Sequence, residues 1–255
     1  MTLDVNALWL IAFLLVLARA VAWLTVVQPF ATRGVVPTMV TVAVGAALAL
    51  MVVPHLERSA LPVTTAPLIG DLVVQVLTGL AMGFVVQLMI SAVSAAGTFL
   101  DQVGGLTLQP AMNPVGVTEP PLLGNFYRQV VILLLFSTNG YLLMIEGFSR
   151  SFAGPAFTLG ATRTVGTVVV TDLQTFFVSA LEIAGPIMVV LFASQIVLAL
   201  VARAAPQANV WFLGLPVQVM LVLLLVALTV SAVPNELANL LGRGLGDSAR
   251  MLGGP

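Results

Sequence analysis

The sequence predicts an all-α integral membrane protein, both from its composition and from the spacing of its apolar segments. Of its 255 residues, 60% are hydrophobic and 7% are charged, and the mean hydropathy is +1.12. About a quarter of the residues of a soluble domain are charged, so this chain cannot form an ordinary water-exposed surface. The net charge of −1 gives no reason to expect a nucleic-acid partner. The absence of cysteine excludes disulfides and thiolate metal sites.

Six apolar segments reach or approach the roughly 20 residues that a helix needs to cross the hydrocarbon core of a bilayer. They are residues 7–28, 35–53, 70–98, 124–148, 173–202 and 208–233. The connections at 29–34 and 203–207 are short, so we expect the helices on either side of each connection to form antiparallel hairpins. Residues 234–255 form a short polar tail.

The first segment is expected to be a retained helix and not a cleaved signal. Ala18-Arg19-Ala20 has the small-residue pattern of a cleavage site, but Asp4 precedes the segment where a signal peptide has basic residues. The apolar run also continues beyond this pattern to Val27.

The third segment carries a stripe of small and polar residues spaced four apart, namely Gln75, Gly79, Gly83, Gln87 and Ser91. Small residues let helix backbones approach closely, and glutamine amides can form hydrogen bonds across the contact where lipid offers no partner. The stripe therefore predicts a helix-packing face. Its partner is either another helix of the same chain or a helix of a partner subunit.

The later segments carry three local signals. Glu146 and Arg150, four residues apart, predict an ion pair at the end of a helix. The connection at 149–172 is rich in glycine and threonine and is expected to be a loop. Gly185-Pro186, inside the fifth segment, is a potential helix break.

No pattern of catalytic or metal-ligating residues occurs in the sequence, which lacks the metalloprotease, serine-hydrolase and nucleotide-binding motifs. The acidic residues lie at segment ends or in connections, where they can reach water. We therefore expect neither an enzyme nor a bound cofactor or metal. A small secondary transporter is a lesser alternative, because Gln75, Gln87, Gln195 and Gln218 place amides at membrane depth.

The connection between the third and fourth segments, residues 99–123, resembles neither a surface loop nor a helix. It has four prolines, and Glu119 is the only charge between Asp101 and Arg128. Proline excludes a spanning helix, and irregular backbone at membrane depth persists only when it is buried in protein or lines a cavity. The loop is therefore either a plug in a channel or a structured loop packed on neighbouring subunits outside the membrane. The candidate plug residues are Leu106, Leu108, Pro110, Met112, Asn113, Pro114, Val115, Gly116, Val117, Pro120 and Pro121.

Four stretches of the sequence carry a recognisable pattern. They are AGTFLDQVGG at 96–105, MNPVG at 112–116, LGNFYRQVVILLLFSTNGYLLMI at 123–145 and RAAPQANVWFLGLP at 203–216. In order and spacing they resemble the FliR family of export-gate proteins, which includes flagellar FliR and its virulence counterpart SctT. The most specific element is RAAPQ, followed by Asn139-Gly140, and Asp101-Gln102 also belongs to the pattern. The flagellar branch fits better, and the virulence branch is the alternative.

The resemblance implies a subunit of a hetero-oligomeric helical pore assembly in the bacterial inner membrane, within the flagellar basal body. The implied partners are FliP-like and FliQ-like membrane subunits, FlhB-like and FlhA-like export components, and unfolded protein substrates that pass through the pore. Within one domain of residues 1–255, residues 1–172 would be FliP-like helices and residues 173–233 a FliQ-like helical hairpin. The resemblance places the plug at about 104–121.

The turn between the last two segments contains Arg203, Pro206, Gln207 and Asn209. Arg203 suits the C-terminal end of a helix, where the helix dipole stabilises a cation, and Pro206 suits the first turn of the next helix. A well-capped turn explains these residue types. The resemblance adds that the turn contacts partner subunits near the entrance of the gate, and both interpretations can hold together.

Overall fold

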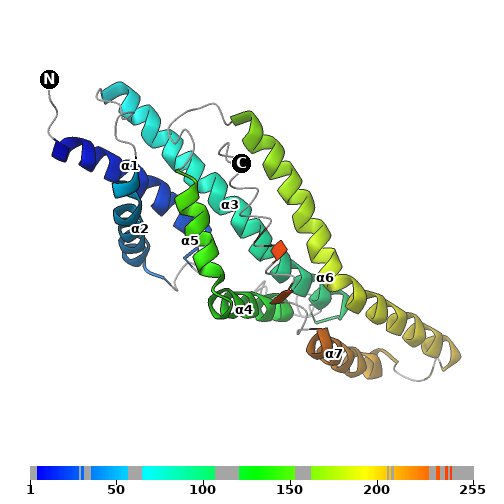
Figure 1. The fold of residues 1–255 in the computed structure, drawn as a ribbon. Coiled ribbons are helices and arrows are strands. Elements are labelled where there is room, and N and C mark those ends of the chain that lie inside the picture. The colour runs from blue at the N-terminus through cyan, green and yellow to red at the C-terminus, as the bar shows by residue number, and fades with distance from the viewer. Residues whose placement is uncertain are drawn as a thin grey trace, which may run out of the picture. The chain divides into compact units, whose positions relative to one another are not determined.

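The computed structural model shows an all-helical chain within the described residues, which confirms the all-α membrane class. The described residues are 5–28, 30–31, 36–56, 65–106, 121–152, 162–205, 207, 210–229, 234–235, 239–240 and 242. The helices are α1 (Val5–Val26), α2 (Thr38–Val52), the 3₁₀ helix η1 (Val53–His55), α3 (Thr65–Val103), α4 (Leu122–Ser137), α5 (Gly140–Arg150), α6 (Thr162–Ala204) and α7 (Val210–Thr229) (Figure 1).

The chain divides into two compact units, which are described separately. The first contains Met1–Met89, Asn139–Leu173 and Leu241–Pro255, and the second contains Ile90–Thr138 and Gln174–Leu240. The sequence-based division into a FliP-like part and a FliQ-like hairpin stays a prediction.

In the first unit, α1 is contacted by α2 and by the small-residue stripe of α3. A Cβ atom on Gly79 would collide with the Arg19 carbonyl oxygen, and one on Gly83 would lie 2.9 Å from the Trp23 carbonyl oxygen. Gln87 continues the contact, because its Oε1 accepts a hydrogen bond at 3.0 Å from the backbone amide of Gln28, which follows the end of α1. The structure thus places this face of α3 against a helix of the same chain.

A buried arginine joins the middle of α1 to the end of α5. Arg19 is 1% exposed, and its Nη1 donates hydrogen bonds to the carbonyl oxygen of Ser151 at 3.0 Å and to its Oγ at 3.1 Å. The guanidinium also lies 4.2 Å from the centroid of the Phe152 ring. Because a charge is costly to bury at membrane depth, these contacts favour one specific packing of α1 on the end of α5.

The prediction of one helix over 124–148 is wrong, because the structure divides this segment into α4 and α5 at Thr138 and Asn139. Asn139 has φ 56° and ψ 24°, the left-handed conformation, and no other non-glycine residue of the described part has a positive φ. L-residues meet a steric cost there, which asparagine tolerates better than most. Asn139-Gly140 therefore separates the two helices, although apolar residues lie on both sides of it.

Asn139→Ala is expected to destabilise the protein by about 1 kcal/mol, because alanine has no polar side chain to support a left-handed backbone. Asn139→Gly should be close to neutral, since glycine adopts this conformation without steric cost. Thermal unfolding of both variants in detergent measures the difference. Equal stability of the two variants would show that residue 139 carries no conformational cost.

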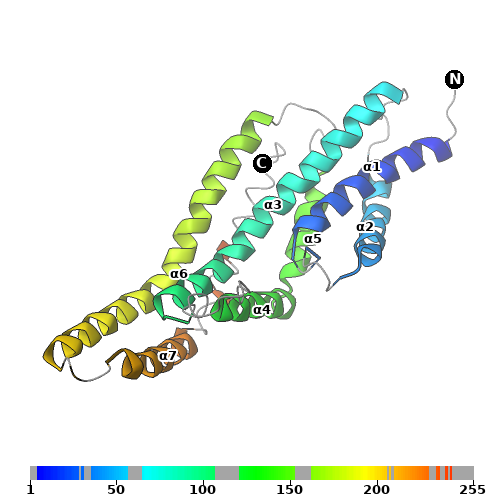
Figure 2. The ribbon, with the colours of Figure 1, turned by 180° about the vertical axis from the view of Figure 1, so that it is seen from behind.

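Two helices are longer than the sequence predicts. The predicted loop at 149–172 contains the first turns of α6, which begins at Thr162 and has 43 residues, and α3 has 39 residues. Threonine and glycine have modest helix propensity, but extending a helix that already exists needs no new nucleus. The break expected at Gly185-Pro186 is wrong, because α6 continues through Pro186. The middle of its ribbon changes direction (Figures 1 and 2), as a proline within a helix causes.

Helix lengths do not correspond to six membrane crossings. Three helical stretches of the described residues are long and apolar enough to cross a membrane, namely Leu8–Val26, Leu68–Val103 and Val170–Ala204, and α4 with α5 would make a fourth if counted as one span. The apolar helix Thr38–Val52 and the stretch Gly214–Leu228 within α7 are shorter. At about 1.5 Å per residue, α6 is about 65 Å long, twice the roughly 30 Å of the hydrocarbon core.

In the second unit, α6 and α7 form the predicted hairpin. α6 ends at Ala204 and α7 begins at Val210, and the two helices lie side by side in both views (Figures 1 and 2). A Cβ atom on Gly214 would lie 3.2 Å from Leu198 Cδ1, so the small residue on α7 lets the two helices approach.

Candidate functional site

The candidate site is formed by the two helix ends that flank the proline-rich connection between α3 and α4. Of the predicted plug residues, Leu106 and Pro121 lie within the described residues. The others lie outside them: Leu108, Pro110, Met112, Asn113, Pro114, Val115, Gly116, Val117 and Pro120. We call residues 101–106 and 121–124, which flank the loop in the second unit, the loop stem.

The first part of the loop stem is the C-terminal end of α3, which a glycine terminates. Gly105 has φ 74°, a left-handed conformation that glycine adopts readily. The Leu106 amide donates to the Asp101 carbonyl oxygen at 3.0 Å and the Gly105 amide to the Gln102 carbonyl oxygen at 3.4 Å. This pair of bonds is the Schellman motif, which satisfies the last carbonyl groups of a helix. α3 therefore ends at a defined position.

The Asp101 side chain caps the helix on the other side of the loop. It is 0% exposed, and its Oδ1 and Oδ2 accept hydrogen bonds from the Leu123 and Gly124 amides, each at 3.0 Å. Pro121, at the N-cap position of α4, makes no side-chain capping bond, so Asp101 supplies the acceptors that the first turn of α4 requires. The carboxylate also suits the positive end of the helix dipole.

Small residues let the two sides of the loop stem approach closely. A Cβ atom on Gly97 of α3 would lie 2.6 Å from the Leu123 carbonyl oxygen, and one on Gly124 would lie 2.5 Å from Thr98 Oγ1. The first turn of α4 therefore packs directly on the last turns of α3. Together with the Asp101 bonds, this contact fixes both ends of the loop side by side.

The hairpin of α6 and α7 packs against the end of α3 in the loop stem. Gln195 Nε2 on α6 donates a hydrogen bond at 2.7 Å to the carbonyl oxygen of Val103, the last residue of α3. A Cβ atom on Gly104 would lie 2.6 Å from Val222 Cγ2 on α7. The loop stem is thus held by hydrogen bonds and close packing, an arrangement that positions a loop and offers no nucleophile or acid–base pair.

The other predicted site residues lie elsewhere. Arg203 is in the last turn of α6, as predicted, and Arg203 and Gln207 are exposed, whereas Pro206 and Asn209 lie outside the described residues. Gly79 and Gly83 of the α3 stripe contact α1, Gln87 bonds to the chain just beyond α1, Gln75 is buried, and Ser91 is half-buried. Among the residues that the structure describes, no group of three or more His, Cys, Asp or Glu side chains forms a possible metal site.

Sequence reasoning missed two residues that hold the structure together. The cleavage-site pattern around Arg19 does not indicate its role, although a lone arginine in an apolar run is itself a signal of a specific buried contact. The sequence indicates Gln195 only as an amide at membrane depth, and the structure bonds it to the Val103 carbonyl. No feature of the sequence near Gln195 identifies that partner.

Comparison with known proteins shows which family this chain belongs to. The flagellar biosynthetic protein FliR of Bacillus subtilis (strain 168) is 29% identical over 149 residues, which cover 57% of this chain and 58% of that protein. FliR of Pectobacterium carotovorum subsp. carotovorum is 24% identical over 235 residues, covering 89% and 87%. The surface presentation of antigens protein SpaR of Salmonella typhimurium (strain LT2) is 25% identical over 217 residues, covering 83% and 81%. The sequence pattern of the family "Bacterial export proteins, family 1" matches residues 10–244, and this chain therefore belongs to that family.

Proposed function

We propose that this chain is a subunit of the flagellar type III protein export gate in the bacterial inner membrane. The observation that carries the proposal is the family match over residues 10–244, together with relatives named flagellar biosynthetic protein FliR. The subunit forms and closes part of the channel through which unfolded flagellar proteins pass. It has no catalytic role, and energy and substrate choice come from other components.

The exposed surface of α6 supports a role inside a larger assembly. Only 17% of its apolar stretch, Val170–Ala204, is buried within the chain, and side chains such as Phe192 and Leu200 are 62% and 61% exposed. A helix of about 65 Å cannot place all of this surface in a hydrocarbon core of roughly 30 Å. We infer that FliP-like and FliQ-like subunits cover the remainder, with FlhB-like and FlhA-like components nearby.

The loop stem supports the proposed role of residues 104–121 as a plug. A plug must return to one position, and the fixed ends of the loop restrict where it can lie. The Asp101 bonds to the Leu123 and Gly124 amides give it a defined origin, independent of how the loop itself is folded. An uncharged, proline-rich segment held there would exclude water and ions when the gate is idle.

A virulence-system gate is the second candidate, because relatives named SpaR and Yop proteins translocation protein T also match this chain. Two complementation assays separate the candidates. Expression in a bacterium lacking its flagellar gate subunit should restore motility if this chain is flagellar. Restoration of virulence-protein secretion in an injectisome mutant, without motility, would favour the second candidate.

The experiment that tests gate membership is purification from the native membrane. A gate subunit should copurify in a stable hetero-oligomer with FliP-like and FliQ-like chains and show no transport activity alone. A monodisperse protein that moves a small solute when reconstituted by itself would favour the transporter alternative instead.

A further inference from the structure

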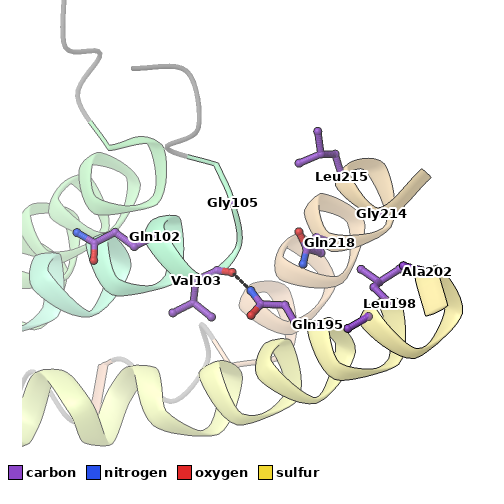
Figure 3. Close-up of a pocket in the computed structure, with 10 residues that line it drawn as sticks. Gln102, Val103, Gly105, Gln195, Leu198, Ala202, Gly214, Leu215 and Gln218 are labelled. Atoms are coloured by element: carbon purple, nitrogen blue, oxygen red, sulfur yellow. Dashed lines mark hydrogen bonds between the residues drawn. The ribbon is translucent and has the colours of Figure 1, made fainter. Parts of the chain in front are cut away.

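A cavity of about 430 Å³ lies in the second unit, between the end of α3 and the hairpin of α6 and α7 (Figure 3). Among the described residues, its polar lining comes from Gln102, Gln195 and Gln218, and the other lining residues are glycine, alanine, valine and leucine. The volume lies within the range of about 300–1,000 Å³ typical of ligand pockets. The described residues of the wall carry no charge, so they offer no group that would select an ion.

Two of the glutamines meet at this cavity from different helices. Gln195 rises from α6 toward the end of α3, and Gln218 enters from α7 (Figure 3). The bond from Gln195 Nε2 to the Val103 carbonyl oxygen at 2.7 Å orients that amide and leaves its oxygen as an acceptor. Gln218 offers both a donor NH₂ group and an acceptor oxygen.

A primary amide is the side chain most similar to a peptide group, because both present one carbonyl acceptor beside N–H donors. A peptide unit can therefore exchange hydrogen bonds with a glutamine amide in both directions. The wall residues Gly105, Ala199, Ala202 and Gly214 are small, which lets another backbone approach closely. None of these contacts requires a particular side chain on the bound chain.

From these features we infer that the cavity binds the main chain of an extended polypeptide, independently of its sequence. This inference rests on the proposed export function and names the part of the substrate that the subunit contacts. Gln218 and the Gln195 oxygen bind peptide groups of the passing chain. The small, uncharged wall accommodates its varied side chains without retaining any of them.

Site-specific photocrosslinking in the complete gate tests the inference. A benzoylphenylalanine replaces Leu215, which lines the cavity, while an export substrate fused to a stably folded domain is stalled in the channel. The matched control places the same group at Leu224, nine residues on, which faces the opposite side of α7 at about 3.6 residues per turn. Crosslinks to the substrate at 215 and not at 224 are expected.

Two outcomes would overturn the inference. Crosslinks from 215 to another gate subunit, with none to the stalled substrate, would assign the cavity to a subunit contact. Equal substrate crosslinking at both positions would show that the cavity has no particular role. Failure of the proposed function itself is distinguishable, because the unmodified chain would then neither copurify with the gate nor support export.

A second variant tests the main-chain chemistry. Gln218→Leu keeps the size of the side chain and removes its amide, so the crosslink yield at 215 should fall about fivefold, as for one lost hydrogen bond. Two substrates of unrelated sequence should be affected equally, and the exposed Gln174→Leu should affect neither. A loss confined to one substrate would contradict binding through the main chain.

Discussion

Asp101→Ala is expected to release the first turn of α4 and to cost about 2–4 kcal/mol, because the buried amides of Leu123 and Gly124 lose their acceptors. Asp101→Asn keeps one acceptor oxygen and should cost about half as much. Hydrogen exchange of the peptide covering 121–125 measures the effect directly. Its amides should exchange about 30-fold faster or more in the alanine variant, since opening costs less free energy.

A matched control for this prediction is Glu146→Ala. Glu146 pairs with Arg150 at 2.6 Å, with both side chains more than half exposed, and surface pairs of this kind contribute little. Exchange at 121–125 should be unchanged in this variant. Unchanged exchange in Asp101→Ala as well would show that the α4 amides find other acceptors and that the loop stem does not depend on the carboxylate.

Gly79→Ala is expected to separate α3 from α1, because the added Cβ atom would meet the Arg19 carbonyl oxygen, a backbone atom that cannot rotate away. Overpacking of this kind costs about 1–3 kcal/mol. The shift would also disturb the bonds from Arg19 to Ser151, which depend on the position of α1. Thermal unfolding in detergent measures the effect, and we expect a lower midpoint for Gly79→Ala than for the unmodified protein.

Gly70→Ala is the matched control, since Gly70 lies on the same helix and no atom from elsewhere in the fold lies within 4 Å of its Cβ position. Alanine is about 0.5–1 kcal/mol better than glycine inside a helix, so this variant should be neutral or slightly stabilising. If Gly79→Ala behaved in the same way, the close packing of α1 on the stripe would be disproved.

The sequence predicts the fold class and the large features well, for identifiable physical reasons. Extreme apolarity leaves a helical membrane protein as the accessible class, and spacing of four predicts that Gly79 and Gly83 share a packing face. The ion pair of Glu146 and Arg150 is confirmed because it needs only one helix. The hairpin of α6 and α7 follows from a short connection between two apolar runs.

The features that could not be predicted depend on contacts distant in the sequence. Asp101 belongs to a recognisable motif, yet the residues around it do not indicate that its side chain caps α4 at Leu123, 22 residues later. The break at Asn139 is different, because the local stretch Ser137-Thr138-Asn139-Gly140 contains an Asn-Gly turn signal, which the apolar residues on either side outweigh when hydropathy is averaged over the whole segment. The helix α6 is long because an existing helix extends into neighbouring residues of modest helix propensity. Hydropathy follows only its apolar part and therefore underestimates its length.

The measurement that tests the central claim most directly is the ion permeability of the assembled gate with residues 106–119 deleted. The deletion removes Leu106 but spares Asp101 and the first turn of α4, so the Asp101 bonds to the Leu123 and Gly124 amides and the assembly should survive, as copurification with the partner subunits would verify. The account predicts that the intact gate, reconstituted in vesicles without substrate, stays closed and that the deleted gate conducts small ions. A deleted gate that assembles normally and stays as tight as the intact one would contradict the plug.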